Sequence, residues 1–499
     1  MQPVEVSLRT AGQHLAAGRS KEALSVLDEA LASRPGYPPL VSLKAVALMR
    51  DGQGEAAVRQ AEAALAPQPD WPDGLANLGY VLFGLGRASE AERALRRALD
   101  KDRTHEASTL TLGHILARSG RAEEAVALFR DALAARPQHT ALLYNLALAL
   151  KQNDANDEAL EIFCGLFEKD PNQIEAANQA AALLLAADKP DEALVLLDRA
   201  VARRPRHGRS HNNRGTALRA LHRPHEALEA YRMGIELQPE RGDGWRNLGL
   251  LAAELDQIDE ARRAFRRALE LTPDDTISRH MLDAVEGHTT ATPPPGFIAA
   301  NFDAFAPIFE RQLVERLNYQ APQDLAALGA RLRPQGFGEA LDIGCGTGLV
   351  AEAFGKQVES WTGIDLSPRM VEIAGTKNRY QRLEIAEAAE FLAINRTRWD
   401  LVTAADLLIY LGDIGPLFAG VQARLAPGGL FLFSTERATA EEGAFRLRAT
   451  GRYAQSDEHI AAVAAANGLA VAASEQSVLR QQHNREVPGT LFALQAKAD

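Results

Sequence analysis

The sequence repeats with a period of 34 residues, and this period limits the possible folds more than any other feature. Alanine occupies one phase of eight successive units: Ala23, Ala57, Ala91, Ala125, Ala159, Ala193, Ala227 and Ala261. A large apolar residue, for example Phe129 or Tyr231, follows four positions later in most units, and proline follows twelve positions later in seven. Such a period indicates units of two antiparallel helices, which bury their apolar faces only by stacking on neighbouring units.

A small residue precedes the alanine by twelve positions in most units: Gly79, Gly113, Ala147, Ala181, Gly215 and Gly249. A small residue lets the first helix approach the second closely, the large residue fills the space between units, and proline ends the second helix. The pattern resembles the tetratricopeptide repeat. The resemblance implies an all-α solenoid of eight helix pairs, and we expect the more polar segment 274–287 to cap its end. Residues 1–287 form this first predicted domain.

Polar amides recur at one position of the predicted first helices: Asn77, Asn145, Gln179, Asn213 and Asn247. Asparagine is a poor residue for a helix interior, so its recurrence on the predicted concave wall needs a reason. One interpretation is a ladder of amides that hydrogen-bonds the backbone of an extended protein segment or peptide. This ladder resembles those of other tetratricopeptide proteins that hold peptides. The alternative, equally supported, is that asparagine is simply common at this repeat position and caps local loops.

Charge and composition exclude several classes of function. The net charge is −11, with 36 basic and 42 acidic residues in 1–287 and 19 and 24 in 288–499, so neither part has the basic excess typical of nucleic-acid binding. The first residues lack the pattern of a secretory signal, and no uncharged apolar stretch reaches the roughly 18 residues of a membrane span. Cys164 and Cys345 offer no metal cluster. We therefore expect a cytoplasmic protein without bound metal.

The pattern changes after "GHTTATPPPGF", where three prolines interrupt the helical period. We interpret residues 288–297 as a short, semi-rigid linker. Residues 298–499 alternate strands with helices, which predicts an α/β, Rossmann-like domain with a parallel sheet between helices. The predicted strands lie near residues 340–343, 360–364, 382–386, 401–404, 429–434, 470–474 and 490–495.

The stretch "EALDIGCGTGLVAEAFGK" joins the first of these strands to a helix through a glycine-rich turn. Dinucleotide sites have the spacing G-x-G-x-x-G, whereas this turn has G-x-G-x-G, with Leu349 in place of the last glycine. Asp342, inside the strand, would repel a pyrophosphate but suits a cationic amino acid group. The turn therefore favours S-adenosylmethionine, whose ammonium and sulfonium groups are both cationic.

Residues after the next strands complete the predicted cofactor site. Asp365 ends the second strand, where a carboxylate can accept hydrogen bonds from both ribose hydroxyls. Leu366 and Met370 could pack on the adenine, and Glu387 lies where its amino group is expected. The full set of predicted cofactor residues is Asp342, Gly344, Cys345, Gly346, Asp365, Leu366, Met370, Glu387 and Ala404.

Four motifs in order, "ALDIGCGTG", "GIDLSPRM", "WDLV" and "LAPGG", resemble the class I methyltransferase family, and more closely its bacterial members that carry tetratricopeptide repeats. The resemblance implies a seven-stranded sheet whose final strand is antiparallel. It also implies a helical lid from the segment before the first strand, in which Phe302, Phe305 and Phe309 line the cofactor or simply pack.

The residues that act on the methyl acceptor are less clearly indicated. Candidates for the catalytic role are Asp406, Tyr410 and Glu436, and candidates for a basic lid that holds an anionic acceptor are Arg446, Arg452 and Tyr453. Three functions are consistent with the sequence. They are a methyltransferase whose repeats recruit a protein substrate or partner, a small-molecule methyltransferase whose repeats only mediate assembly, and a scaffold that has lost activity.

Overall fold

The computed structural model describes residues 3–294, 296–306, 309–310, 319–482 and 485–496. The chain divides into two compact units, Met1–Leu183 and Leu184–Asp499, which we describe separately. The second unit combines the last repeats with the sheet domain. The division therefore falls before the sequence boundary at 288–297 that we predict from the change of pattern.

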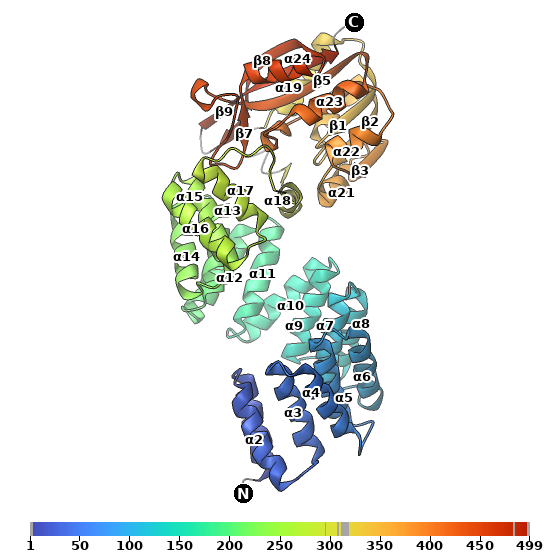
Figure 1. Cartoon of the computed structure of the whole chain (residues 1–499), viewed down its shortest axis with the longest axis vertical. Coiled ribbons are helices and arrows are strands. Elements are labelled where there is room, and N and C mark those ends of the chain that lie inside the picture. The colour runs from blue at the N-terminus through green and yellow to red at the C-terminus, as the bar shows by residue number, and fades with distance from the viewer. Residues whose placement is uncertain (1–2, 295, 307–308, 311–318, 483–484, 497–499) are drawn as a thin grey trace. The chain divides into compact units, whose positions relative to one another are not determined.

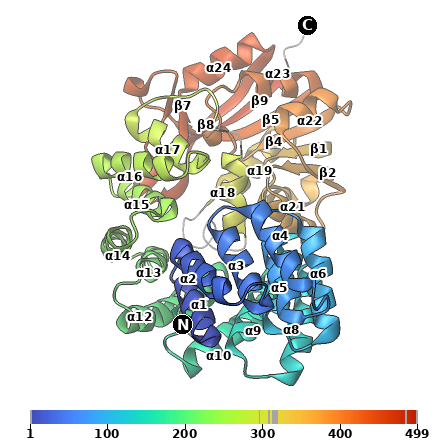
Figure 2. The same cartoon turned by 60° about the horizontal axis from the view of Figure 1, so that its bottom comes forward.

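The first unit is built of helix pairs, as the 34-residue period predicts, and Figure 2 shows α1 beside α2 and α5 beside α6. Its helices are α1 (Val4–Ala16), α2 (Ser20–Ser33), α3 (Pro38–Arg50), α4 (Gly54–Leu65), α5 (Pro72–Gly84), α6 (Ala88–Lys101), α7 (Glu106–Arg118), α8 (Ala122–Ala135), α9 (Thr140–Gln152), α10 (Asn156–Lys169) and α11 (Ile174–Ala186), which crosses into the second unit.

The small and large residues of the repeat meet as the spacing predicts. A Cβ atom added to Gly113 of α7 would lie 2.1 Å from the ring of Phe129 in α8. Phe129 is 1% exposed, so its ring fills the space that the glycine leaves open. The repeat alanine itself, for example Ala125, is fully buried. Helices α7 and α8 therefore approach each other so closely that a larger residue at Gly113 would not fit.

The second unit begins with the remaining repeats (Figure 1). Their helices are α12 (Pro190–Arg203), α13 (Gly208–Ala220), α14 (Pro224–Leu237), α15 (Gly242–Glu254), α16 (Ile258–Leu271) and α17 (Thr276–Glu286). The segment 274–287, which we expect to cap the repeats, contains the helix α17. Asp275 caps its first turn by accepting hydrogen bonds from the N–H groups of Ile277 and Ser278, and Gly287 ends it in the left-handed conformation, with φ of 77°.

The sheet of the second unit has nine strands in the described part of the chain, two more than the seven predicted. They are β1 (Phe337–Ile343), β2 (Val358–Asp365), β3 (Arg382–Ile385), β4 (Trp399–Ala404), β5 (Leu425–Arg437), β6 (Phe445–Leu447), β7 (Tyr453–Gln455), β8 (Leu469–Gln482) and β9 (Arg485–Ala496). The order β3-β2-β1-β4-β5 is parallel, and β9 pairs antiparallel with β5, as predicted.

The two additional strands form a short hairpin, β6–β7, which we predicted instead as a basic lid. Strand β7 pairs in parallel with the last residues of β5, Glu436 and Arg437, beyond the point where β4 ends. Its two strands have three residues each, too short to show the alternation of apolar and polar residues that identifies a strand. The hairpin therefore extends the sheet at the carboxyl end of β4.

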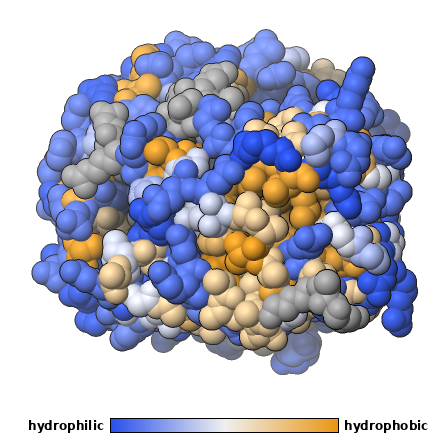
Figure 3. Space-filling model, turned by 90° about the horizontal axis from the view of Figure 1, so that it is seen from above, coloured by the Kyte–Doolittle hydropathy of each residue, from blue (hydrophilic) through white to orange (hydrophobic). Residues whose placement is uncertain are grey.

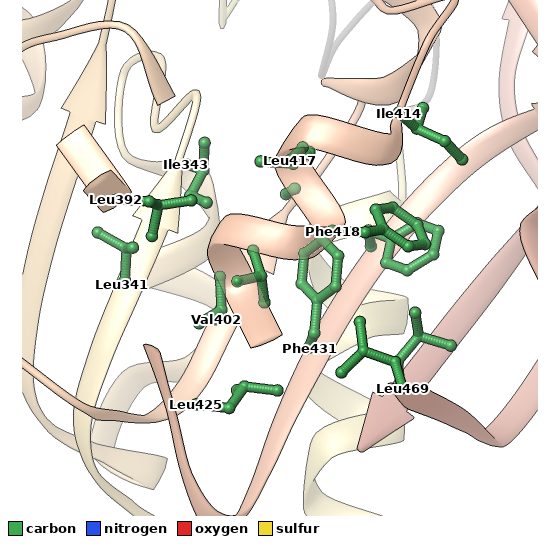
Figure 4. Packing of buried hydrophobic residues seen from close by; sticks show 14 of the residues in the cluster. Leu341, Ile343, Leu392, Val402, Ile414, Leu417, Phe418, Leu425, Phe431 and Leu469 are labelled. Atoms are coloured by element: carbon green, nitrogen blue, oxygen red, sulfur yellow. The ribbon is translucent and has the colours of Figure 1, made fainter. Parts of the chain in front are cut away.

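Helices cover both faces of the sheet and form two apolar cores. The helices of this domain are α18 (Phe297–Phe305), α19 (Ala321–Leu332), α20 (Leu349–Phe354), α21 (Pro368–Thr376), α22 (Ala388–Ile394), α23 (Gly415–Arg424) and α24 (Asp457–Ala466). Helices α22, α23 and α24 pack on one core, where Phe418 lies against Phe431 of β5 (Figure 4). Helices α19 and α20 pack on the other core, around Phe354. The buried cores fix the strands whose ends carry the site.

Hydrophilic side chains cover most of the face seen in Figure 3, and apolar side chains gather near its centre. Among the residues that the structure describes, none of the helices combines the length and the apolar character that crossing a membrane requires.

Candidate functional site

A cavity of about 670 Å³ lies at the carboxyl ends of the parallel strands. Its walls include the turn after β1, the residues after β2 and β3, and the segment from Ala405 to Leu411 after β4. Ligands of parallel α/β sheets bind in this place because the strand order reverses there, between β1 and β4. Two carboxylates and two apolar side chains that the sequence predicts for the cofactor site therefore line one cavity. They are Asp365, Glu387, Leu366 and Met370.

The glycine turn after β1 needs a backbone that only glycine adopts readily. Gly344, Gly346 and Gly348 have φ of 67°, 52° and 91°, all in the left-handed region. Helix α20 begins directly after the turn. The side chain of Thr347 in this turn is 1% exposed and lines the cavity, and its hydroxyl has no hydrogen-bond partner among the described residues. Sequence reasoning missed Thr347, although it lies inside the quoted motif.

Asp365, at the end of β2, is positioned by backbone hydrogen bonds. One carboxylate oxygen accepts from the N–H of Gly346 at 2.9 Å, and the other accepts from the N–H of Ser367 at 2.9 Å. Burial raises the pKa of this carboxyl above its usual value, and these backbone N–H groups oppose the rise. Asp365 lines the cavity, so its remaining lone pairs can accept hydrogen bonds from a ligand.

Asp342 lies beneath the turn, not on the cavity wall. It is fully buried, and its two carboxylate oxygens accept hydrogen bonds from the Tyr380 hydroxyl at 2.8 Å and from the Thr403 hydroxyl at 2.7 Å. Burial raises its pKa to about 7, against the effect of the two hydroxyls. This carboxyl therefore does not line the cavity, although it lies two residues before Gly344, which does.

Seven of the nine predicted cofactor residues line the cavity, namely Gly344, Cys345, Gly346, Asp365, Leu366, Met370 and Glu387. Asp342 and Ala404 are fully buried and do not line it, and Ala405 takes the place predicted for Ala404. The difference of one residue arises because the side chain of Ala404 points into the core between β4 and α23. Glu387 also accepts a hydrogen bond from the N–H of Glu390 and so caps α22.

The three catalytic candidates have different environments. Asp406 lines the cavity, and its carboxylate accepts from the Ser434 hydroxyl at 3.0 Å and from Nη1 of Arg480 at 2.9 Å. Burial raises the pKa of Asp406, and the guanidinium of Arg480 opposes this rise. Glu436 does not line the cavity, because Arg480 and Arg448 both bond its carboxylate. Of the two carboxylates, only Asp406 can therefore reach a ligand.

Arg480 was not identified from the sequence. It is 1% exposed, lines the cavity, and pairs with both Asp406 and Glu436. Its Nε atom has no hydrogen-bond partner in the described part of the chain. Strand β8, with the sequence LAVAASEQSVLRQQ, contains several polar residues besides Arg480, so its sequence gives no signal that this arginine is buried.

Aromatic side chains cover one end of the cavity. Tyr410 lines it, and the ring of Phe302 meets the ring of Tyr410 edge to face at 5.2 Å. Phe309 also lines it, 6.0 Å from Phe302. The third predicted aromatic residue of this lid, Phe305, has a side chain outside the part that the structure describes. These rings make this end of the cavity apolar.

Only one of the three predicted substrate residues lies at the cavity. Arg452 lines it. Arg446 lies instead beside Gly287, at the end of α17. Tyr453 is fully buried, with its hydroxyl 2.6 Å from that of Thr290. The predicted lid is thus wrong for Arg446 and Tyr453, because the segment folds as the β6–β7 hairpin and turns these two side chains toward the repeats.

The predicted amide ladder of the repeats contacts neighbouring repeats. Asn77 donates to the Ser42 hydroxyl at 2.8 Å, Asn145 accepts from His114 at 2.7 Å, and Gln179 accepts from Lys151 at 3.1 Å. Asn247 donates to Asn212 at 3.2 Å, and Asn213 also has a partner. These bonds link neighbouring repeats, which neither the ladder nor the capping of local loops predicts. Each amide has capacity for three or four hydrogen bonds, so binding of a peptide is compatible with them.

Family models match both parts of the chain. A family model described as a methyltransferase domain matches residues 313–474. Models described as tetratricopeptide repeats match residues 14–78, 74–101, 110–173, 178–239 and 213–276.

Curated relatives are similar to a part of the sheet domain. The ubiquinone biosynthesis O-methyltransferase of Coxiella burnetii is 34% identical over 98 residues, which are 19% of this chain and 42% of that protein. The enzyme of the same name from Xanthomonas axonopodis pv. citri is 32% identical over 135 residues, 26% of this chain and 55% of that protein. The chain thus spans about half the length of the curated relatives that it matches.

Solved structures are similar to each part. The N-methyltransferase NodS from Bradyrhizobium japonicum WM9, in complex with S-adenosyl-L-homocysteine, covers 36% of this chain with 86% of its own, at 20% identity and a TM-score of 0.30. A tetratricopeptide repeat protein from Parabacteroides merdae covers 50% of this chain with 98% of its own, at 16% identity and a TM-score of 0.39.

Proposed function

The chain joins tetratricopeptide repeats to a methyltransferase domain, and we propose that it transfers a methyl group from S-adenosylmethionine to an oxygen atom of an apolar acceptor. The oxygen is supported by the name of the curated relatives, O-methyltransferases, and by a carboxylate, Asp406, on the cavity wall. The apolar acceptor is supported by the aromatic and aliphatic lining, which includes Phe302, Leu411 and Leu417.

The residues of the cavity suit the cofactor. The glycine turn leaves space for an amino acid group, and the unpartnered hydroxyl of Thr347 supplies a buried polar group that a ligand can satisfy. Asp365 can accept from the ribose hydroxyls, while Leu366 and Met370 supply apolar contacts for the adenine. When bound, S-adenosylmethionine supplies a methyl group on a sulfonium, an excellent leaving group. The protein needs mainly to align the acceptor and exclude water.

Asp406 is suited to remove the proton of an acceptor hydroxyl. Burial raises its pKa, which makes the carboxylate a stronger base than an exposed aspartate. Arg480 and Ser434 fix its orientation through one hydrogen bond to each oxygen, which leaves further lone pairs on both. Arg480 Nε can donate to a second oxygen of the acceptor, since no described residue occupies it. Tyr410 borders the same space.

The observation that carries this proposal is the carboxylate of Asp365, fixed by the glycine turn and facing the cavity. Replacing it in Asp365→Ala should weaken binding of S-adenosylhomocysteine by roughly 10- to 100-fold, the value of hydrogen bonds to a charged group. Titration calorimetry measures this affinity, and Asp191→Ala, which removes an exposed aspartate of α12, serves as the control. Equal affinities of wild type and Asp365→Ala would refute the placement. Labelled cofactor then identifies the methylated product.

We further infer that the repeats bind a protein segment, either the substrate or a partner that presents it. Asn145 borders a hollow of about 290 Å³ on α5, α7 and α9, together with Phe83, His114 and Arg118. Amide, aromatic and cationic groups side by side suit the backbone and side chains of a peptide. A variant with Asn145, Asn213 and Asn247 changed to alanine should lose co-purifying proteins while keeping its affinity for S-adenosylhomocysteine. An unchanged set of co-purifying proteins would contradict the ladder.

A further inference from the structure

Residues 288–294, here called the junction segment, follow the last repeat helix and contain prolines that predict a spacer. We propose that the junction segment instead forms the acceptor-side wall of the cavity, and that α17, the end of the repeats, holds this wall in place. The inference rests on the proposed function, because it assigns one part of the cavity to the methyl acceptor.

The junction segment contacts the sheet domain through three hydrogen bonds of backbone and side-chain groups. The N–H of Asp413 donates to the carbonyl of Ala291 at 2.7 Å. The N–H of Leu447 in β6 donates to the hydroxyl of Thr289 at 3.3 Å. The hydroxyls of Thr290 and Tyr453 lie 2.6 Å apart. A flexible spacer would leave these groups to water, so the contacts indicate a docked segment.

The last repeat helix anchors the other side of the hairpin. His280 of α17 is 1% exposed, and its Nε2 atom lies 2.8 Å from the carbonyl oxygen of Gly451 in the turn between β6 and β7. Ala284 of α17 shares a buried apolar cluster with Leu447 and Tyr453. The hairpin, the junction segment and the end of the repeats therefore form one packed body.

The junction segment reaches the cavity on the side away from the predicted cofactor residues. Thr292, Pro293 and Pro294 line the cavity. The cofactor candidates follow β1, β2 and β3, whereas the partners of the junction segment follow β4 and belong to the β6–β7 hairpin, on the opposite side of β1 in the strand order. This is also the side of Asp406. The wall is rigid and apolar, because proline has a fixed φ and no N–H group.

A substitution at Gly412 can test whether the junction segment is docked without changing a residue that lines the cavity. Gly412 precedes Asp413 and does not line the cavity, and a Cβ atom added to it would lie 2.5 Å from the carbonyl oxygen of Thr290 and 2.7 Å from that of Ala291. The substitution Gly412→Ala should therefore push the junction segment off the sheet domain. Gly375→Ala in α21 is the matched control, since its nearest contact would be an ordinary 3.7 Å.

Hydrogen exchange of the full chain reports whether the segment is docked. In Gly412→Ala the amide hydrogens of Asp413 and Leu447 should exchange about tenfold faster or more, whereas Gly375→Ala should match wild type. The second measurement is the affinity of anilinonaphthalene sulfonate, an apolar fluorophore, for protein saturated with S-adenosylhomocysteine. That affinity should fall about fivefold or more in Gly412→Ala, with the affinity for S-adenosylhomocysteine changed by less than about twofold.

The outcomes separate this inference from the proposed function. Unchanged exchange at Asp413, or faster exchange with unchanged dye affinity, overturns the assignment of the wall. If wild type does not bind S-adenosylhomocysteine, the proposed function fails, and the exchange data still decide whether the segment is docked. If Gly412→Ala does not fold, Tyr453→Phe, which removes only the hydroxyl that contacts Thr290, should accelerate exchange at Leu447. No acceleration there overturns the inference.

Discussion

At the scale of single residues, burial raises the pKa of Asp342, and we expect cofactor binding to lower it. Its pKa of about 7, far above the ordinary 3.8, means that the carboxyl is about half protonated at neutral pH. A cationic ammonium bound near the glycine turn would favour the carboxylate and lower this pKa. Binding should then release a proton. Affinity for S-adenosylhomocysteine should rise between about pH 6 and 8, as the carboxyl ionises, and level off above that range.

Calorimetry in two buffers with different ionisation enthalpies measures this proton release. At pH 7 wild type should release about half a proton per bound ligand, as its pKa predicts, and Asp342→Asn should release none. Asn at this position can still accept from Thr403 or Tyr380 and has no charge to titrate. A pH dependence that persists in Asp342→Asn would show that another group causes it.

The sequence predicts residues of the site well where a local motif carries them. Gly344 to Gly348 and Asp365 lie in or directly after strands, so their neighbours along the chain suffice to place them. Arg480 cannot be predicted in this way, because its partners Asp406 and Glu436 lie 74 and 44 residues away in the sequence. Its role depends on β5 and β8 being brought together by β9, which no local pattern shows.

At the scale of elements, the β6–β7 hairpin is the part of the fold that the sequence does not predict. The other strands have an apolar core or a motif at their end, whereas this hairpin is stabilised by contacts with β5, the junction segment and α17. Its basic residues suggest a solvent-exposed or ligand-binding segment. In the structure Arg448 instead donates hydrogen bonds to Glu442 and Glu436. The conformation of this segment therefore depends on tertiary contacts, which its local composition does not show.

Arg480 forms ion pairs with Asp406 and Glu436, and Arg448 forms a further ion pair with Glu436. We expect substitution of Glu436 to affect stability and substitution of Asp406 to affect turnover. Glu436→Gln would leave Arg480 and Arg448 short of one negative charge and should destabilise the second unit by about 3 kcal/mol. Asp406→Asn keeps an acceptor for Arg480 but lacks the proposed base, so turnover should fall by about 10² to 10⁴. Thermal unfolding and transfer of labelled methyl groups to the identified acceptor measure the two effects. Full turnover of Asp406→Asn would remove it from the mechanism.

At the scale of the whole molecule, the repeats are the most predictable part, because one period determines both the helix lengths and the contacts between helices. The period does not show where the chain divides into compact units. The same repeat positions make the packing contacts in every repeat, so the repeat pattern does not distinguish one pair of neighbours from another. The division between Leu183 and Leu184 therefore cannot be read from the period. The sequence boundary at 288–297 marks a change of pattern, while α17 packs on both sides of it.

Two glycines of the first unit test whether repeats respond only to their neighbours. A Cβ atom at Gly113 would meet the buried ring of Phe129, whereas one at Gly165 in α10 would meet nothing within 4 Å. Gly113→Ala should therefore destabilise α7 and α8 by about 1–3 kcal/mol through overpacking. Gly165→Ala should stabilise α10 by up to about 1 kcal/mol through backbone entropy.

Hydrogen exchange measured helix by helix reports these changes. The stability of a solenoid is a sum of terms within repeats and between neighbours, so both effects should remain within a repeat or two of the substitution. Neither variant should change the affinity for S-adenosylhomocysteine, since the cavity belongs to the unit Leu184–Asp499. A weaker affinity in Gly113→Ala alone would mean that strain in distant repeats reaches the cavity. Such a result would contradict the expectation that a substitution in one repeat affects only the neighbouring repeats.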